Sequence, residues 1–444
     1  MFPLPGLLSV LRDLDTDESQ GHLHRRNKPK TMVKKKQVLI LGAGVAGLTA
    51  AQELAHTGVQ VLLLERMPFI GGHAAIFTCK ATDKCAKCNY CLVQARLKET
   101  SGDNGLELRL RTEVEAIERN GKMFHVSFRS GPKVIDPDKC TDCGLCYEKC
   151  PEGTIIAAPS PHLHPFYAID PFKCADLEEK EKRSCESVCP EGAINFQEEE
   201  EIGSRHVDGV ILATGYEPFD PGEIKRLNFQ QFKNVVTEMD LEKVLRLQGD
   251  IYRPSDNAPP KSMAFIQCVG SRDPHLNHDY CSRVCCGYAL RMALRILHVH
   301  PQTQITLFYM DIQNFGKDFE RYYEEARDSV RLIRGLPGDV YPAGNDTVSL
   351  SFYDEETRRT IAEDFDMVIL SVGITPSASH DFFRDRLGLS LNEDGFFSAP
   401  DPTKNKGIFV AGSAEGPMNV AESITHGKRA ALEMAKYLGV VKDQ

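Results

Sequence analysis

Cysteines carry the clearest chemical signal in this sequence of 444 residues, which contains 15 of them. They fall into three groups, within residues 79–91, 140–189 and 268–286. Dense disulfide frameworks belong to small secreted domains, whereas closely spaced thiols in a long chain more often bind metals or carry out redox chemistry. The three groups therefore predict metal centres. The alternative is that individual thiols are buried as small apolar side chains.

The middle group reads KCTDCGLCYEKCPEGTI and then KCADLEEKEKRSCESVCPEGAINF. Its first half has the C-x2-C-x2-C-x3-C-P spacing of bacterial ferredoxins, in which three neighbouring thiolates bind one cluster and the fourth binds another. This spacing assigns one [4Fe-4S] cluster to Cys140, Cys143, Cys146 and Cys189. A second cluster would use Cys150, Cys174 and Cys185.

The second of these sites departs from the ferredoxin pattern, because Lys182 stands where a further cysteine is expected. The site could hold a [3Fe-4S] cluster, or a [4Fe-4S] cluster with a different fourth ligand such as Asp176. Zinc is the rival occupant of any four-thiolate set. The ferredoxin spacing favours iron and sulfide over zinc.

The first group is also spaced for cluster binding, and the third group stands at an unexpected place in the chain. FTCKATDKCAKCNYCLVQ places thiols as C-x5-C-x2-C-x2-C and predicts another [4Fe-4S] cluster, with zinc or a redox-active dithiol as alternatives. CVGSRDPHLNHDYCSRVCC places its thiols where an apolar run, MAFIQ, leads into an expected helix. The candidate ligands are Cys79, Cys85, Cys88 and Cys91 in the first group, and Cys268, Cys281, Cys285 and Cys286 in the third.

A scaffold must position these thiols, and the segment KKQVLILGAGVAGLTAAQELAHTGVQVLLLE indicates which one. It reads as strand, tight turn, helix and strand, with Gly42, Gly44 and Gly47 spaced G-x-G-x-x-G. Glycines at this spacing let a pyrophosphate approach the helix N-terminus, whose free N–H groups favour an anion. Glu65 ends the second strand, placed to accept hydrogen bonds from ribose hydroxyls. The segment therefore predicts a dinucleotide site.

A second strand, helix and strand are predicted from MAFIQCVGS, CCGYALRMALRILH and QITLFYMD, with Asp311 at the end of the second strand. This pattern predicts a second nucleotide-binding-like domain, but no G-x-G-x-x-G joins its first strand to its helix. The third cysteine group stands there instead. Because a helix N-terminus favours thiolates, Cys285 and Cys286 are expected to be cluster ligands at the start of that helix.

Three further segments resemble the two-dinucleotide-binding-domain flavoproteins. They are E-x5-G-G from Glu65 to Gly71-Gly72, VDGVILATGYEP, and GIFVAGSAEGPMNVAESITHGKRAALEMAKYL. The family usually has an acid after the glycine of the last segment, and Ser413 stands there in this chain. The resemblance implies FAD as the dinucleotide, bound by Gly42, Ala43, Gly44, Val45, Ala46, Gly47, Glu65, Arg66, Gly71, Gly72, His73, Val114, Ala213, Thr214, Gly215, Gly412 and Ser413.

The expected fold class is therefore α/β, a thioredoxin-reductase-like flavoprotein with two dinucleotide-binding domains and an inserted bacterial-type ferredoxin module. Before the insertion, LELRLRTEVEAIERNGKMFHVSF alternates around an Asn120-Gly121 hairpin turn. We expect a disordered tail over 1–35, the FAD-binding domain in three parts over 36–131, 199–220 and 377–444, the ferredoxin module over 132–198, and the second domain over 221–376.

GAGVAGLTAA, the ferredoxin run, CVGSRD, YCSRVCC and AGSAEGP together resemble the A subunit of heterodisulfide reductase over roughly residues 36–440. Bacterial relatives of that family include the A subunit of the quinone-interacting membrane-bound oxidoreductase. The resemblance implies an oxidoreductase subunit, active within a complex, that passes electrons between FAD and three to four [4Fe-4S] clusters. It also implies that Cys268, Cys281, Cys285 and Cys286 bind one of these clusters. It leaves flavin-based bifurcation open. The partners it implies are heterodisulfide reductase B/C-like or other redox subunits, a hydrogenase, a ferredoxin or a membrane quinone module.

Composition narrows the remaining possibilities. A net charge of −10 argues against nucleic acid as a partner, and apolar stretches such as VLILGAGVAGL are too short to span a bilayer. Clusters favour a reducing compartment, hence the cytoplasm, with peripheral attachment to the inner face of a membrane complex as an alternative. The start, at Met1 or Met32, stays open. The competing functions are a stand-alone NAD(P)H-dependent flavin disulfide reductase and a flavin scaffold carrying zinc.

Overall fold

The computed structural model describes residues 35–100, 105–150, 154–158, 166–174, 184–313, 319–355 and 357–441. These residues belong to one unit that begins at Lys35. The predicted tail, apart from its last residue, lies outside the described residues, as do Asp176 and Lys182. Within the described ranges, no helix is both long enough and apolar enough to cross a membrane.

A five-stranded parallel sheet carries the glycine motif, with the strand order β20-β9-β1-β2-β3. Parallel strands are buried on both faces, which explains why this sheet is built from continuous apolar runs such as VLIL and VLLL. Its strands are β1 (Gln37–Leu41), β2 (Gln60–Leu64), β3 (Leu106–Arg109), β9 (Gly209–Leu212) and β20 (Ile408–Val410).

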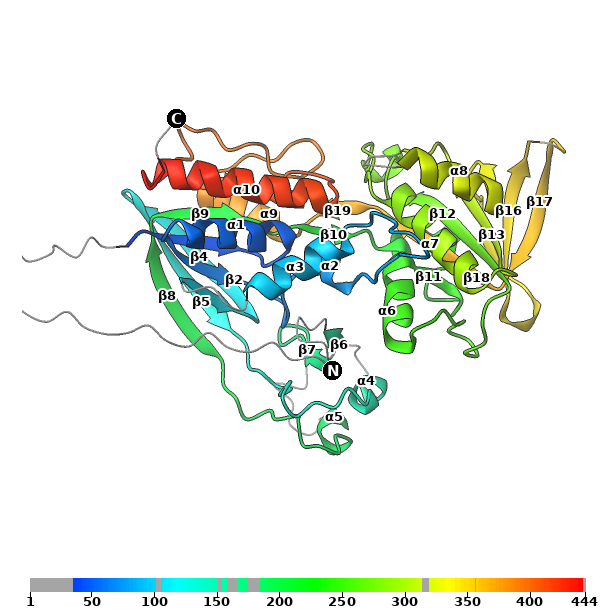
Figure 1. Cartoon of the computed structure of the whole chain (residues 1–444), viewed down its shortest axis with the longest axis horizontal. Helices are drawn as coiled ribbons and strands as arrows, with labels where there is room; N and C mark the ends of the chain where they lie inside the picture. The colour runs from blue at the N-terminus through cyan, green and yellow to red at the C-terminus, as the bar shows by residue number, and fades with distance from the viewer. Residues whose placement is uncertain are drawn as a thin grey trace, which may run out of the picture. The chain divides into compact units, whose positions relative to one another are not determined.

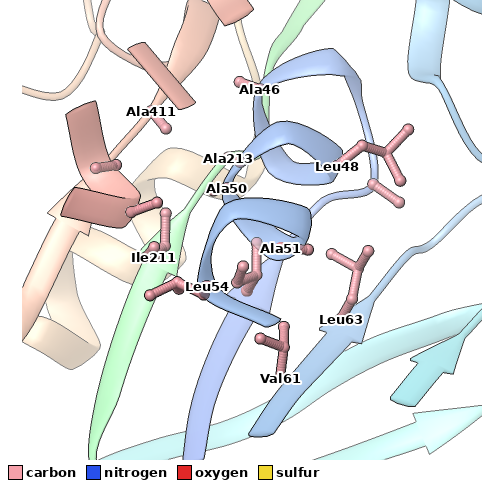
Figure 2. Close-up of a cluster of buried hydrophobic side chains, with 14 of the residues drawn as sticks. Ala46, Leu48, Ala50, Ala51, Leu54, Val61, Leu63, Ile211, Ala213 and Ala411 are labelled. Atoms are coloured by element: carbon pink, nitrogen blue, oxygen red, sulfur yellow. The ribbon is translucent and has the colours of Figure 1, made fainter. Parts of the chain in front are cut away.

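Two helices distant in sequence, α1 (Val45–His56) and α10 (Val420–Tyr437), lie side by side next to this sheet (Figure 1). Small residues allow the close approach, because a Cβ at Gly427 would lie only 2.4 Å from the backbone oxygen of Ala46. Figure 2 shows the interior below α1, where Leu54 lies near Ile211 of β9. The packing fixes the helix that follows the glycine turn.

A three-stranded antiparallel sheet, β4-β5-β8, covers the other face of the parallel sheet, where Phe124, Val126 and Phe128 form a second core with Leu39 and Leu62. Asn120 pairs with Met123, so the predicted hairpin turn is confirmed. The strands are β4 (Thr112–Asn120), β5 (Met123–Ser130) and β8 (Glu201–Val207). The neighbouring elements are α2 (Gly72–Ile76), α3 (Tyr90–Thr100), α9 (Ser379–Leu387), the 3-10 helix η7 (Gly412–Ala414), and the antiparallel pair β10 (Tyr216–Pro218) and β19 (Ile374–Pro376).

The segment between β5 and β8 forms a small cysteine-rich core of its own. Its apolar centre includes Val134, Ile155, Tyr167 and Phe196, and six of its cysteines pack against or within it. Its described elements are α4 (Leu145–Lys149), β6 (Ile155–Ala158), β7 (Phe166–Ile169) and α5 (Ser184–Ser187), with β6 and β7 antiparallel.

A second five-stranded parallel sheet has the order β11-β18-β12-β13-β14. The predicted strand, helix and strand around the third cysteine group are confirmed as β12 (Ser262–Val269), α7 (Cys285–Val299) and β13 (Gln304–Tyr309). The other elements are β11 (Val235–Thr237), α6 (Glu238–Gln248), α8 (Phe319–Ser329), β14 (Arg331–Arg334), β18 (Met367–Val372), the antiparallel strands β15 (Val340–Pro342), β16 (Val348–Asp354) and β17 (Arg359–Phe365), and the 3-10 turns η3 (Pro221–Glu223), η4 (Lys225–Leu227), η5 (Pro274–Leu276) and η6 (Gly344–Asp346).

Candidate functional site

A cavity of about 1210 Å³ runs from the glycine turn to the start of α7. Most of the residues predicted to bind the dinucleotide line it: Gly42, Gly44, Val45, Ala46, Glu65, Arg66, Gly71, Gly72, His73, Val114, Ala213, Thr214, Gly215 and Ser413. Ala43, Gly47 and Gly412 do not line it. They lie in the glycine turn, in the first turn of α1 and at the start of η7, next to residues that line the cavity.

The glycine turn has the form that a phosphate cradle requires. A Cβ at Gly42 would lie 2.3 Å from the backbone oxygen of Ala213, and one at Gly47 would lie 1.9 Å from the backbone oxygen of Gly42. These two glycines allow the backbones to pack closely. Gly44 differs, because a Cβ there would meet nothing within 4 Å and would enter the cavity.

Unused hydrogen-bonding groups in the wall fit a polar ligand. The N-terminus of α1 begins after Gly44 and has no side-chain cap, so its first N–H groups are available to an anion. The hydroxyl of Thr214 is buried in the cavity wall, with no hydrogen-bond partner among the described residues. These donors fit the phosphates and hydroxyls of a dinucleotide.

Glu65 fixes the same turn. Its carboxylate accepts hydrogen bonds from the backbone N–H of Ala43 at 2.6 Å and from that of Met67 at 2.8 Å. Burial raises the pKa of Glu65, and these two N–H groups oppose the rise. Because each carboxylate oxygen has a second lone pair, the side chain can still accept from a ribose hydroxyl. Glu65 thus holds the cradle in shape in addition to its predicted role.

His73 lies in the wall against β10. Its Nε2 is 3.1 Å from the backbone oxygen of Tyr216, and the two rings are 4.8 Å apart. Burial lowers the pKa of His73, so the neutral imidazole donates to that carbonyl. This contact orients the ring beside the predicted flavin site.

Glu238 is a cavity residue that the sequence did not reveal. It begins α6 and accepts a hydrogen bond from the backbone N–H of Val372 at 2.8 Å. Burial raises the pKa of Glu238 to about 8, although that hydrogen bond lowers it. Thr237 and Asp240 form a capping box around this position. From sequence, such a pattern indicates an exposed acid in the first turn of a helix, not a buried one.

Glu238→Gln should change how stability depends on pH. The folded pKa of Glu238 lies above its ordinary value of 4.5, at about 8, so its contribution is complete below pH 4.5 and is lost as pH rises towards 8. Glutamine keeps the shape and cannot ionise. The free energy of unfolding of the variant, relative to that of the wild type, should therefore rise by up to about 1.4 kcal/mol per pH unit between pH 4.5 and 8. Urea unfolding at several pH values measures this, and parallel profiles would contradict it.

The third cysteine group gathers at the start of α7, as predicted, since that helix begins at Cys285. Cys268, Cys285 and Cys286 are buried, and Cys285 also lines the cavity. The Cys285 thiol donates towards its neighbours, which lowers the pKa of Cys286 and raises that of Cys285. The backbone N–H of Arg283 donates to the sulfur of Cys281 at 3.3 Å. The loop thus already directs an N–H group at a candidate ligand sulfur.

Two arginines hold this loop. Arg272 forms an ion pair with Asp311 at the end of the second strand. The guanidinium of Arg283 donates to Glu422 at 2.8 Å and to the backbone oxygen of Pro417 at 3.1 Å, at the start of α10. Arg283 therefore connects the loop of the third cysteine group to α10, the helix that packs against α1.

The cysteines of the middle group surround one small core, with Cys146 and Cys185 buried. Burial raises the pKa of Cys146 to about 12, and the nearby thiols of Cys140, Cys143 and Cys185 add to the rise. A bound metal reverses this balance, because a coordinating thiol is deprotonated. The backbone N–H of Ala193 also donates to the Cys189 sulfur at 3.3 Å.

The first cysteine group leaves Cys79, Cys85 and Cys91 exposed, while Cys88 lines the cavity. Tyr322 of α8 donates to the backbone oxygen of Cys85 at 3.0 Å, so this segment rests on the second sheet's helices. In the part of the chain that the structure describes, no three His, Cys, Asp or Glu side chains are grouped so that they could hold a metal ion. The ligand sets therefore stay predictions.

Known protein families match two of the regions described above. Residues 40–91 match the family described as NAD(P)-binding Rossmann-like domain, and residues 133–156 match the 4Fe-4S binding domain. The chain is 35% identical over 428 residues to the second iron-sulfur A subunit of CoB–CoM heterodisulfide reductase from Methanopyrus kandleri, an alignment that covers 90% of this chain and 64% of that relative. The predicted resemblance to the A subunit of heterodisulfide reductase is confirmed.

Another relative of this A-subunit-like chain is the A subunit of the H2:CoB-CoM heterodisulfide,ferredoxin reductase of Methanothermobacter marburgensis. The two are 33% identical over 429 residues, which make up 90% of this chain and 64% of that one. The chain thus spans somewhat less than two thirds of the length of these relatives.

The solved structure of Lactococcus lactis thioredoxin reductase covers 92% of the A-subunit-like chain and all of its own, with a TM-score of 0.52 and 16% identity. Thioredoxin reductase from T. acidophilum gives 0.51, also at 16% identity. The predicted thioredoxin-reductase-like fold class is confirmed. Together with the two family matches, it establishes a dinucleotide-binding fold that contains a 4Fe-4S binding domain.

Proposed function

We propose that this chain is an electron-transfer flavo-iron–sulfur oxidoreductase subunit of a heterodisulfide-reductase-like complex, passing electrons between FAD and [4Fe-4S] clusters. One observation carries the proposal. The helix that would bind the phosphates of a nicotinamide dinucleotide begins with Cys285 and Cys286 instead, and Cys285 lines the same cavity as the glycine cradle. The thiols therefore stand where a hydride carrier would bind.

FAD is the dinucleotide that the cradle would hold, with Gly44, Thr214 and Ser413 in the cavity wall. The flavin supplies the ability to accept two electrons and release them one at a time. The chain's own residues would bind and orient it, since the uncapped N-terminus of α1 offers N–H groups to the phosphates and Glu65 fixes the turn.

The clusters would be held by the cysteine sets predicted from the spacing of the first two groups and from the family resemblance of the third. They would be three to four in number, one of them a [3Fe-4S] cluster if Cys150, Cys174 and Cys185 act alone. Protein N–H groups directed at sulfur raise a cluster's reduction potential. Arg283 N–H towards Cys281 and Ala193 N–H towards Cys189 are two such groups. The chain's contribution is thus to order the potentials along the route.

Exposed thiols at Cys79, Cys85, Cys91 and Cys143 support exchange of electrons with other proteins. The proposed partners are heterodisulfide reductase B/C-like or other redox subunits, with a hydrogenase, a ferredoxin or a membrane quinone module as alternatives. A reducing, cytoplasmic setting follows from the clusters, with peripheral attachment to a membrane complex as an option. Flavin-based bifurcation is the further option for the chemistry.

The test is anaerobic reconstitution followed by metal analysis and reduction. Iron and acid-labile sulfide should match three to four clusters per FAD, and NADH or NADPH without partners should leave the flavin oxidised while dithionite reduces it. Rapid stoichiometric bleaching by NADH would overturn the proposal in favour of a stand-alone disulfide reductase. Low iron with high zinc would overturn it in favour of structural zinc sites.

Cys286→Ala should remove one cluster and leave FAD bound. The thiol lies in the first turn of α7, and its replacement takes away a ligand without touching the glycine cradle. Iron per chain should fall by about four, as one [4Fe-4S] cluster is lost, with flavin content unchanged. Ser282→Ala is the matched control in the same loop, since the Ser282 hydroxyl accepts the backbone N–H of Ile374 and is no candidate ligand. Ser282→Ala should keep its iron, and wild-type iron in Cys286→Ala would exclude Cys286 as a ligand.

A further inference from the structure

Arg66 connects the cavity to the inserted cysteine-rich segment. It follows Glu65 at the end of β2 and lines the cavity. Its Nε donates to Glu113 at 2.7 Å, and its Nη1 lies 3.4 Å from the carboxylate of Asp170. The Asp170 side chain, which comes from the inserted segment, is only 2% exposed. One cavity residue is thus paired with a buried acid of the insertion.

The turn formed by residues 170–174 contacts both the cavity and the arginines around it. The ring of Phe172 lies 5.4 Å from the guanidinium of Arg66 and 5.4 Å from that of Arg129. Lys173 lines the cavity, and the backbone N–H of the next residue, Cys174, donates to the backbone oxygen of Asp170 at 3.2 Å. The turn therefore borders the cavity at one residue and carries a candidate cluster ligand at the next.

We propose that the inserted segment completes the dinucleotide site through Lys173, and that the Arg66–Asp170 pair couples cofactor binding to the seating of residues 170–174. This inference rests on the proposed function, because it takes the cavity ligand to be FAD. It deepens that function by making the turn next to Cys174 sensitive to whether the cavity is filled.

The physical reason lies in the solvent exposure of the pair. The Arg66 side chain is 42% exposed, whereas that of Asp170 is 2% exposed. A ligand filling the cavity removes water from the guanidinium and strengthens its attraction to the buried carboxylate. The ammonium of Lys173 adds positive charge at the cavity wall, which suits an anionic dinucleotide. Since coupling is reciprocal, a well-seated turn must tighten cofactor binding by the same factor.

The experiment compares the full chain with Arg66→Gln, Asp170→Asn and Arg129→Gln. FAD affinity is measured by titrating FAD into the deflavinated protein, and backbone hydrogen exchange over residues 166–174 is measured with and without FAD. In the wild type, FAD should slow exchange in this turn. Asp170→Asn keeps the oxygen that accepts the Phe172 N–H but loses the charge. It should weaken FAD binding about tenfold and abolish the FAD-dependent protection.

Arg129→Gln is the matched control, because Arg129 contacts Phe172 without lining the cavity and reaches Glu113, the partner of Arg66, only at 3.9 Å. It should leave FAD affinity and the FAD-dependent protection unchanged. Arg66→Lys, which keeps the charge, should recover part of the affinity that Arg66→Gln loses. If Asp170→Asn binds FAD as the wild type does and keeps the protection, the coupling is refuted. If the wild type binds no FAD at all, the proposed function fails instead, so the two failures are distinguishable.

Discussion

Gly44→Ala should abolish FAD binding while leaving the stability of the fold nearly unchanged. The backbone at Gly44 has φ −69°, which any residue adopts, and an added Cβ meets nothing within 4 Å. The methyl group would stand in the cavity where the phosphates must approach the N-terminus of α1. We expect the affinity for FAD to fall at least about 100-fold, which corresponds to about 3 kcal/mol.

Gly47→Ala is the matched comparison within the same motif. A Cβ at Gly47 would lie 1.9 Å from the backbone oxygen of Gly42, so the turn itself would have to move. This variant should lose about 3 kcal/mol of folding free energy, measured by urea unfolding. Gly44→Ala should stay within about 0.5 kcal/mol of the wild type in the same experiment. Wild-type FAD affinity in Gly44→Ala would show that the phosphates do not bind at this turn.

Lys80→Met should be among the most destabilising single substitutions in the chain, at about 3–5 kcal/mol. Lys80 is 4% exposed and forms an ion pair with Glu242 of α6, which is completely buried. Thr78 supports the carboxylate through its backbone N–H at 2.9 Å and its hydroxyl at 2.8 Å. Removing the ammonium leaves a buried carboxylate without its counter-charge. Urea unfolding of the iron-free protein measures the loss without interference from cluster chemistry.

Two further variants test whether the loss of stability comes from the unpaired buried charge. The double variant Lys80→Met with Glu242→Leu should recover most of the lost stability, because an apolar pair carries no unpaired charge. Lys428→Met breaks an exposed pair with Glu53 at 3.1 Å, and should cost less than about 1 kcal/mol. A cost for Lys80→Met no greater than that for Lys428→Met would refute the role assigned to the buried pair.

The scaffold could be predicted from the sequence because its signals are local. G-x-G-x-x-G after an apolar run, the Asn120-Gly121 turn, and the start of α7 at Cys285 each depend on neighbouring residues, and all three appear as expected. The thioredoxin-reductase-like fold was implied by the resemblance of three segments to the two-dinucleotide-binding-domain flavoproteins, and it is confirmed. Local periodicity and turn chemistry determine such elements before tertiary contacts form.

The polar contacts between distant segments could not be predicted in this way. Lys80 and Glu242 lie far apart in sequence, and residues of both types are usually exposed on the protein surface. Glu238 follows a capping threonine and would ordinarily face water. Arg66 and Asp170 meet only because the inserted segment folds back onto β2. Burial of these charges is a property of the assembled fold, not of a spacing.

The contact between α1 and α10 means that the cavity is completed late in translation of the chain. The glycine cradle precedes most of both sheets in the sequence, whereas the helix packed against it through Gly427 follows both sheets. Until this last part of the chain is translated, Ala46 and Thr49 of α1 lack the neighbour that Gly427 provides, and the cavity lacks Ser413 and Asn419. Contacts between such distant segments form late. The cavity is therefore complete only after α10 is translated, when the cysteine segments have already emerged.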